Sequence, residues 1–279
     1  PIEFENALDM FRAGVAEDPS AEAIRYFDGV ITRRELDEQS DALASALLAG
    51  GFTRGDRLAV YLQNVPQFVI SMVATWKAGG VMVSINPMSR VRELSYLLKD
   101  SGAKVLVALE SLYDEIGRQV VPDTDVELVL TTSELDHQTR ADERLFKGMT
   151  RQRHEGTTDF GELIEQHRGE IPPPVTLTAD DIAFLTYTSG TTGVPKGAMN
   201  THRNVVFTAQ VYRDWVHVDG AGPILGIAPL FHITGLIGHI AVSLLTPAPL
   251  ILAYRFEPQV VLDALAEHRP TFTIGAITA

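Results

Sequence analysis

The amino-acid sequence predicts an α/β fold built from doubly wound parallel sheets. Over the first two thirds of the chain, short apolar runs typical of strands alternate with segments of helical periodicity. Glycines follow several of the helical segments, where helices commonly end. The length of 279 residues, with 45% hydrophobic and 21% charged residues, suits one large or two modest globular units.

A capping pattern predicts the first helix. Thr32 and Glu35 match a capping box, in which each side chain accepts a hydrogen bond from a backbone N–H at the start of a helix. Gly50 and Gly51 end this helix ahead of a strand at residues 58–62. Its apolar face consists of Leu36, Leu43, Ala44 and Leu47.

Two more helix–strand units follow. Apolar residues at i, i+3, i+4 and i+7 predict a helix that ends at Gly79 and Gly80, before a strand at 81–85. This apolar set is Val69, Met72, Val73 and Trp76. Ser89 can cap a third helix, which Gly102 closes before a strand at 104–109.

The later part of the chain is less regular. After a strand near 126–130, residues 133–170 are polar and weakly patterned, and we interpret them as a surface excursion that prolines 172–174 stiffen at its exit. Residues 271–279 form an apolar, strand-like run without a turn or cap. We therefore expect a truncated sequence, or a larger protein that continues past this point.

Composition excludes several classes of protein. A formal net charge of −13 argues against a nucleic-acid partner, because phosphate backbones are bound by clustered Lys and Arg. The absence of cysteine excludes disulfides and thiolate chemistry, which is consistent with a cytoplasmic location. Residues 220–254 carry no charged side chain, but four prolines divide them, so we expect short buried pieces and not a transmembrane segment.

The segment at 187–197, which reads YTSGTTGVPKG, follows an apolar strand at 182–186. Three glycines let the backbone approach a ligand closely, four hydroxyl side chains surround the loop, and Lys196 adds a cation. The alternative is a glycine-rich turn that merely connects two strands. Eleven residues in this order favour a phosphate loop, and Gly197 after Lys196 excludes a Walker A motif.

This segment resembles the signature of the AMP-binding, adenylate-forming superfamily, which includes acyl-CoA synthetases, aryl-CoA ligases, luciferases and the adenylation domains of peptide synthetases. Residues 76–87, WKAGGVMVSINP, are similar to the segment that precedes the nucleotide loop in this family. Residues 228–235, APLFHITG, are similar to its aromatic–histidine segment at the acyl site. The resemblance extends from about Phe11 to the end of the chain.

The resemblance implies the domain organisation. It corresponds to a partial N-terminal AMP-binding domain with two interleaved α/β subdomains, roughly 60–215 as one and 1–59 with 216–279 as the other. The later family motifs, among them an acidic Mg²⁺ ligand, a ribose-binding Asp and a catalytic Lys on a C-terminal domain, are not found before Ala279. We therefore expect the C-terminal domain to be absent and the 279 residues alone to be inactive.

The resemblance also implies roles for the phosphate loop. Its residues would bind the phosphates of ATP, with Thr188 also contributing to the Mg²⁺ shell and Lys196 acting in catalysis by neutralising phosphate charge. The proposed nucleotide-binding residues are Thr188, Ser189, Gly190, Thr191, Thr192, Gly193 and Lys196.

At the acyl site the resemblance implies that His232 acts at the carboxylate end of the pocket, with Thr234 and Gly235 lining it. The alternative for His232 is a satisfied core histidine. Family members that activate amino acids place an Asp near this point, and residues 228–235 contain none. Arg255 matches a position where some CoA ligases contact a CoA phosphate, and a solvated charge at a strand end is the alternative.

These interpretations together predict ATP-dependent activation of a carboxylic acid to acyl-AMP and then acyl-CoA. We favour an uncharged fatty acid, because apolar residues surround His232 and both ends of the chain are more similar to fatty-acid ligases than to plant aryl-CoA ligases. Amino-acid or aryl-acid activation, and a non-catalytic nucleotide- or acyl-binding fragment, remain alternatives. The expected small-molecule partners are the acid, ATP and coenzyme A, and the oligomeric state stays open, with a homodimer as one alternative.

Overall fold

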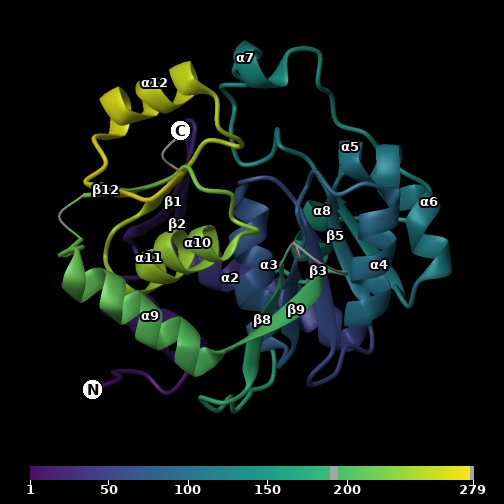
Figure 1. Ribbon diagram of the computed structural model, residues 1–279, viewed down its shortest axis with the longest axis horizontal. Coiled ribbons are helices and arrows are strands. Elements are labelled where there is room, and N and C mark those ends of the chain that lie inside the picture. Colours follow the sequence, from purple (N-terminus) through teal and green to yellow (C-terminus); the bar gives the residue numbers. More distant parts are fainter. Residues whose placement is uncertain (189–193, 221, 277–279) are drawn as a thin grey trace.

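The described part of the chain forms two sheets, and helix α3 lies near the centre of the molecule (Figure 1). This computed structural model describes residues 1–188, 194–220 and 222–276. Within them, a seven-stranded sheet has the order β7-β6-β5-β3-β4-β8-β9 and a five-stranded sheet the order β12-β10-β11-β1-β2. The predicted α/β class is confirmed.

Most neighbouring strands are parallel, and the pairs β8–β9 and β1–β2 are antiparallel. The strands of the larger sheet are β3 (Arg57–Tyr61), β4 (Val81–Ser84), β5 (Val105–Leu109), β6 (Leu128–Thr132), β7 (Thr158–Asp159), β8 (Ile182–Thr188) and β9 (Lys196–Thr201). Those of the smaller sheet are β1 (Glu22–Tyr26), β2 (Gly29–Thr32), β10 (Ile224–Gly226), β11 (Leu250–Leu252) and β12 (Phe272–Thr273). The predicted domain limits near residues 60 and 215 stay a prediction.

The helices connect and cover these sheets. The longer ones are α1 (Ala7–Glu17), α2 (Arg33–Ala49), α3 (Pro66–Lys77), α4 (Val91–Ser101), α8 (Phe160–Gln166), α9 (His202–Trp215) and α12 (Pro258–His268). One continuous helical stretch comprises α5 (Glu110–Leu112), η1 (Tyr113–Gly117), α6 (Arg118–Val120) and η2 (Val121–Asp123). Another comprises α10 (Ile233–Gly235), η3 (Leu236–Ala241) and α11 (Val242–Leu245), and α7 (Glu143–Phe146) stands apart.

The larger sheet is covered on both faces, as the doubly wound prediction requires. Along β3, Leu58 and Val60 pack into the core that contains α3, while Ala59 and Tyr61 pack into a second core with α4. This alternation follows from the pleat, which sends successive side chains to opposite faces of a sheet. Both faces are buried, so these strands read as continuous apolar runs.

Helix α3 is buried on every side. The sequence predicts one apolar face for it, yet all 12 of its residues are buried, because α1 and α2 pack against the side that does not face the sheet. Its polar side chains are accommodated by specific partners. Trp76 Nε1 donates to the carbonyl of Ala183 in β8 over 3.0 Å, and Lys77 Nζ lies 2.6 Å from a carboxylate oxygen of both Asp37 and Asp41.

The helix caps confirm two predictions and correct one. Thr32 and Glu35 form the capping box, and Gly102 ends α4 in the left-handed conformation at φ 58°. Ser89 does not cap α4, because the cap residue is Arg90, whose N–H donates to the Glu93 carboxylate over 3.0 Å. The carbonyl of Ser89 accepts a hydrogen bond from the Tyr61 hydroxyl instead.

The prediction of a surface excursion at 133–170 is wrong in part. This segment contains α7, β7 and α8, and it buries Leu145, Phe146, Phe160 and Ile164. Arg151 anchors it, with guanidinium nitrogens 2.9 Å from Glu110, 2.6 Å from Asp136 and 2.5 Å from Asp159. The polar residues therefore pair with one another across elements, which sequence periodicity does not reveal.

The uncharged segment 220–254 divides as predicted into short strands and helical pieces, here β10, the α10–η3–α11 stretch and β11. None of the helices in the described ranges has both the length and the apolar character needed to cross a membrane.

Candidate active site

The predicted phosphate loop begins in β8 and ends in β9, and we call these two strands, residues 182–188 and 196–201, the phosphate hairpin. The two strands pair antiparallel, with Thr188 opposite Lys196 and Tyr187 opposite Gly197. Ser189, Gly190, Thr191, Thr192 and Gly193 lie outside the described residues.

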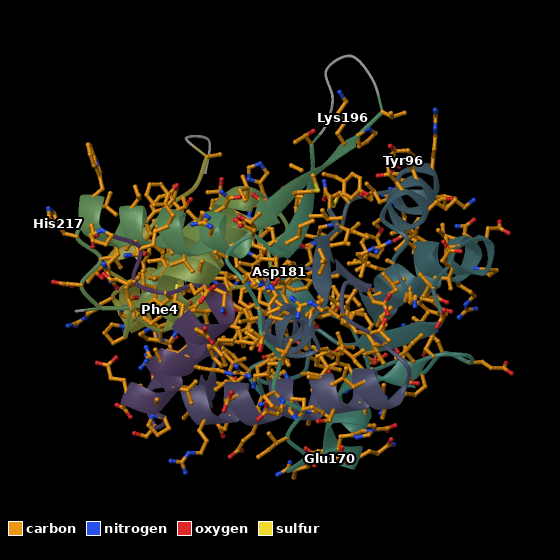
Figure 2. All side chains as sticks on the ribbon, turned by 90° about the horizontal axis from the view of Figure 1, so that it is seen from below. Phe4, Tyr96, Glu170, Asp181, Lys196 and His217 are labelled. Atoms are coloured by element: carbon orange, nitrogen blue, oxygen red, sulfur yellow. The ribbon has the colours of Figure 1, made fainter. Side chains whose placement is uncertain are left out.

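Thr188 and Lys196 are both exposed at the end of the hairpin. Figure 2 shows Lys196 projecting from the edge of the molecule, on the side opposite Glu170. Lys196 forms no ion pair with any residue that the structure describes, and among those residues the Thr188 hydroxyl makes one long, 3.5 Å contact, to the Lys196 carbonyl. A hydroxyl and an ammonium group are thus available together for a phosphate.

Side chains from α4 hold the base of this hairpin. The Tyr96 hydroxyl donates to the Pro195 carbonyl over 2.9 Å, and the Tyr187 hydroxyl donates to Asp100 over 2.7 Å. Burial and this hydrogen bond to a carboxylate raise the pKa of Tyr187, so its hydroxyl remains a neutral donor. A Cβ at Gly197 would lie 3.2 Å from the Tyr187 ring, so the glycine here serves close packing.

The second predicted site is at residues 228–235, and we call this stretch together with the two residues before it, 226–235, the acid segment. His232 is exposed and caps α10, with its Nδ1 accepting the Thr234 N–H over 3.2 Å and lying 3.1 Å from the Thr234 hydroxyl. Because Nδ1 accepts a hydrogen bond, the proton of the neutral ring resides on Nε2. The exposed Nε2–H is therefore a donor that a substrate oxygen can use.

The acid segment folds back tightly on itself. A Cβ at Gly235 would lie 2.3 Å from the Pro229 carbonyl oxygen and 2.7 Å from Leu230 Cα, so only glycine fits. The structure thus brings together the three predicted acyl-site residues, His232, Thr234 and Gly235, in one turn.

Two buried side chains that hold this segment were missed by sequence reasoning. His239, in the π-helical turn η3, accepts the Ala228 N–H at its Nε2 over 3.1 Å, and burial lowers its pKa to about 4. Asn64, which follows β3, makes side-chain hydrogen bonds to Gly226, Ala228 and Leu230. No local sequence signal links either residue to the acid segment.

Arg255 follows β11 and is exposed, with its guanidinium carbon 5.8 Å from the centre of the Tyr254 ring. It lines a cavity of about 260 Å³ together with Asn64, Ala228 and Pro229. Arg255 and the acid segment therefore border the same space.

The carboxyl ends of the two sheets meet near these residues. Asn64, beyond the end of β3, forms an isolated antiparallel bridge with Tyr254, beyond the end of β11. Thr188 ends β8, and the acid segment extends from the end of β10. In open α/β sheets ligands bind outside the carboxyl ends of the strands, so the predicted nucleotide and acid residues occupy the expected edge.

A family model for the AMP-binding enzyme matches residues 11–279. The chain belongs to this family. The resemblance drawn from the residues at 187–197, 76–87 and 228–235 is thereby confirmed.

Individual relatives of this AMP-binding chain agree with the match. It is 31% identical over 288 residues to the long-chain-fatty-acid–CoA ligase of Bacillus subtilis (strain 168), covering 100% of this chain and 51% of that protein. A solved long-chain-fatty-acid–CoA ligase from Archaeoglobus fulgidus shares the fold, with a TM-score of 0.81 at 23% identity over 97% of this chain and 51% of that one. A benzoate–CoA ligase from Burkholderia xenovorans LB400 has the same TM-score, 0.81, at 24% identity over 99% of this chain and 50% of that one. The chain spans about half the length of the relatives it matches.

Proposed function

We propose that this chain supplies the ATP- and acid-binding part of an acid–thiol ligase that activates a carboxylic acid as acyl-AMP and then forms acyl-CoA. The observation that carries the proposal is the exposed Thr188–Lys196 pair on a phosphate hairpin, in a chain that belongs to the AMP-binding family. Both side chains are donors suited to phosphate oxygens, so the available groups fit a nucleotide.

In the first half-reaction a carboxylate oxygen attacks the α-phosphorus of ATP, and the bond to pyrophosphate breaks. Negative charge grows on the leaving pyrophosphate, and Lys196 is the side chain that we propose to neutralise it. Catalysis of this kind rests mainly on positioning and on charge stabilisation. Mg²⁺, when bound with ATP, would share this neutralisation, and in the described part of the chain Thr188 is the candidate side chain for its shell.

His232 has a different proposed role. Its Nε2–H can donate to an oxygen of the substrate carboxylate and so orient the other oxygen for attack. In the second half-reaction the CoA sulfur forms a bond to the acyl carbon, and AMP leaves with the bonding electron pair. Arg255, on the cavity beside the acid segment, is the candidate contact for a CoA phosphate.

We favour an uncharged apolar acid, and a fatty acid over an aryl acid. Residues 222–254 contain no carboxylate that could pair with the ammonium group of an amino acid, and burying that group without a partner is costly. Leu230, Leu236 and Ile237, which lie within five residues of His232 in the sequence, are buried. The named function of the Bacillus relative supports a fatty acid, and the benzoate–CoA ligase keeps aryl acids as the second candidate.

The test is isotope exchange between pyrophosphate and ATP on the full-length protein with octanoate, palmitate, benzoate, coumarate and leucine. We expect exchange that depends on a fatty acid. A clear preference for leucine would contradict the substrate class, and exchange with none of a broad acid panel would indicate a non-catalytic binding protein. Acyl-CoA formation is then measured directly, and Arg255→Ala should raise the KM for CoA without slowing the exchange, which does not use CoA.

A further inference from the structure

Asn64 occupies an unusual place, at the carboxyl end of β3 and against the acid segment of the other sheet. Its side chain is buried, with 6% of the residue exposed. Its Nδ2 donates to the carbonyls of Gly226 over 3.1 Å and Ala228 over 3.0 Å, and its Oδ1 accepts the Leu230 N–H over 2.9 Å. One side chain thus satisfies three backbone groups more than 160 positions away in the sequence.

The carboxamide is the group that these three partners require. It offers two N–H donors and an acceptor oxygen from one planar group. An aspartate would place a second oxygen against two carbonyls, and an apolar residue would leave three buried backbone groups without partners. The backbone N–H of Asn64 also donates to the Tyr254 carbonyl over 2.8 Å, beside Arg255.

Leu230 links Asn64 to the predicted catalytic group. It lies two residues before His232, and the backbone at Leu230 packs so closely on Gly235 that a Cβ there would be 2.7 Å away. The His232 N–H donates to the Pro229 carbonyl over 3.1 Å. A shift of Leu230 therefore moves the whole turn that carries His232 and Thr234.

We propose that Asn64 is a positioning residue for acid activation, which holds the acid segment so that His232 meets the substrate carboxylate. The proposal rests on the proposed function. It assigns Asn64 an effect on the acid and not on ATP, because the described contacts of its side chain reach the acid segment and none reaches the phosphate hairpin.

Gln67 provides a matched control. It lies three residues further along the chain, at the start of α3, and is also a buried carboxamide with 0% exposure. Its Nε2 donates to the Thr132 hydroxyl over 2.9 Å and to the Ser133 carbonyl over 3.0 Å, at the end of β6. Gln67→Ala thus removes buried amide hydrogen bonds without touching the acid segment.

The experiment compares Asn64→Ala with Gln67→Ala in the full-length protein by acid-dependent pyrophosphate exchange. We expect Asn64→Ala to lower kcat/KM for the acid by roughly 100-fold, the usual effect of a displaced reacting group, while the KM for ATP stays near the wild-type value. Gln67→Ala should lower the thermal stability similarly but leave kcat/KM for the acid near wild type. Equal losses of kcat/KM for the acid in the two variants would overturn the proposal.

Hydrogen exchange gives a readout that needs no turnover. The Leu230 amide loses its acceptor in Asn64→Ala, so it should exchange faster there, but not in Gln67→Ala. Asn64→Asp keeps an acceptor for this amide but turns its second oxygen towards the Gly226 and Ala228 carbonyls. Its protection of the Leu230 amide should therefore lie between that of Asn64→Ala and that of the wild type, and it is the second variant if Asn64→Ala does not fold. Unchanged hydrogen exchange at residues 226–232 in Asn64→Ala would refute the role of Asn64. The same holds if hydrogen exchange in Asn64→Asp becomes faster only outside residues 226–232, as expected for Gln67→Ala. If the wild type shows no pyrophosphate–ATP exchange with any acid, the proposed function fails. The hydrogen exchange of the Leu230 amide then still decides whether Asn64 holds the acid segment.

Discussion

The phosphate hairpin and the acid segment are built in different ways. The hairpin is a local structure, in which β8 and β9 pair directly and the exposed Thr188 and Lys196 end opposite each other. The acid segment is held from a distance, by Asn64 after β3 and by His239 in η3. The first can be recognised from contiguous residues, whereas the second depends on contacts that only the folded chain creates.

The difference also separates chemistry from stability. An exposed hairpin side chain has few described partners, so replacing it should affect phosphate binding and leave folding intact. The acid segment is packed and hydrogen bonded, so its residues should affect folding and acid binding together. The four predictions below sharpen or break this contrast.

The largest effect is expected at Lys196. Lys196→Ala in the full-length protein should slow acyl-AMP formation by roughly 10²–10³-fold, the usual result of removing a preorganised charge-stabilising group. Thioester formation from added acyl-AMP should suffer less, because pyrophosphate has left by then, and the melting temperature should not change. Lys99→Ala, at an exposed lysine of the neighbouring α4, is the control. Equal losses in both half-reactions would show that Lys196 does not act on the phosphates.

Two glycines allow a direct comparison of the regions. Gly235→Ala should reduce the free energy of unfolding by about 1–3 kcal/mol, because its Cβ would overlap the Pro229 carbonyl. In Gly197→Ala the new Cβ meets only the edge of the Tyr187 ring at 3.2 Å, so the loss should be much smaller. Urea unfolding of both variants measures the difference. A larger loss for Gly197→Ala would break the contrast.

His239 should make folding stability depend on pH. Burial lowers its folded-state pKa from 6.5 to about 4, so between these values the unfolded chain takes up a proton that the folded chain refuses. The contribution of the neutral His239 to the free energy of unfolding is complete above pH 6.5 and is lost as the pH falls toward 4. The loss between pH 7 and pH 5 amounts to about 2 kcal/mol.

His239→Gln keeps an acceptor for the Ala228 N–H but cannot take up a proton. Urea unfolding at pH 7 and pH 5 should therefore show a smaller stability change for this variant than for the wild type. His217→Gln, at an exposed histidine in Figure 2, should retain the wild-type difference. A His239→Gln variant with undiminished pH dependence would show that His239 is not responsible.

The smallest effect is expected at Tyr96. Tyr96→Phe removes the hydrogen bond to the Pro195 carbonyl, which should cost about 0.5–1.5 kcal/mol of stability. If this contact helps to fix the hairpin, the KM for ATP should rise slightly while the KM for the acid stays constant. A change in the KM for the acid without a change in the KM for ATP would contradict the separation of the two regions.

Much of the fold could be predicted from the sequence because its signals are local. The capping box at Thr32, the glycine end at Gly102 and the apolar strand runs each act within a few residues. The prediction failed where distant contacts decide. In the sequence the polar residues around Arg151 indicate a surface segment. The fold brings Glu110, Asp136 and Asp159 into ion pairs with Arg151, and the sequence does not show these contacts.

The site divides along the same line. Lys196 and His232 could be named from motifs, and the structure places both on exposed positions of the expected edge. Asn64 and His239 could not, because an isolated Asn after a strand or a His in an apolar run is most often structural. Their relevance comes from bonds to backbone groups of another element, which one sequence without its fold does not contain.

The pairing of β1 with β11 has a consequence for biosynthesis. Ile24 pairs with Leu250, so the smaller sheet cannot close until the chain has been made beyond β11, whereas every described strand of the larger sheet is complete by Thr201. At 5–20 residues per second, β1 waits roughly ten to forty-five seconds for its partner β11, although β2 is available at once. During that interval the apolar side chains of β1 and α1 are without their final neighbours.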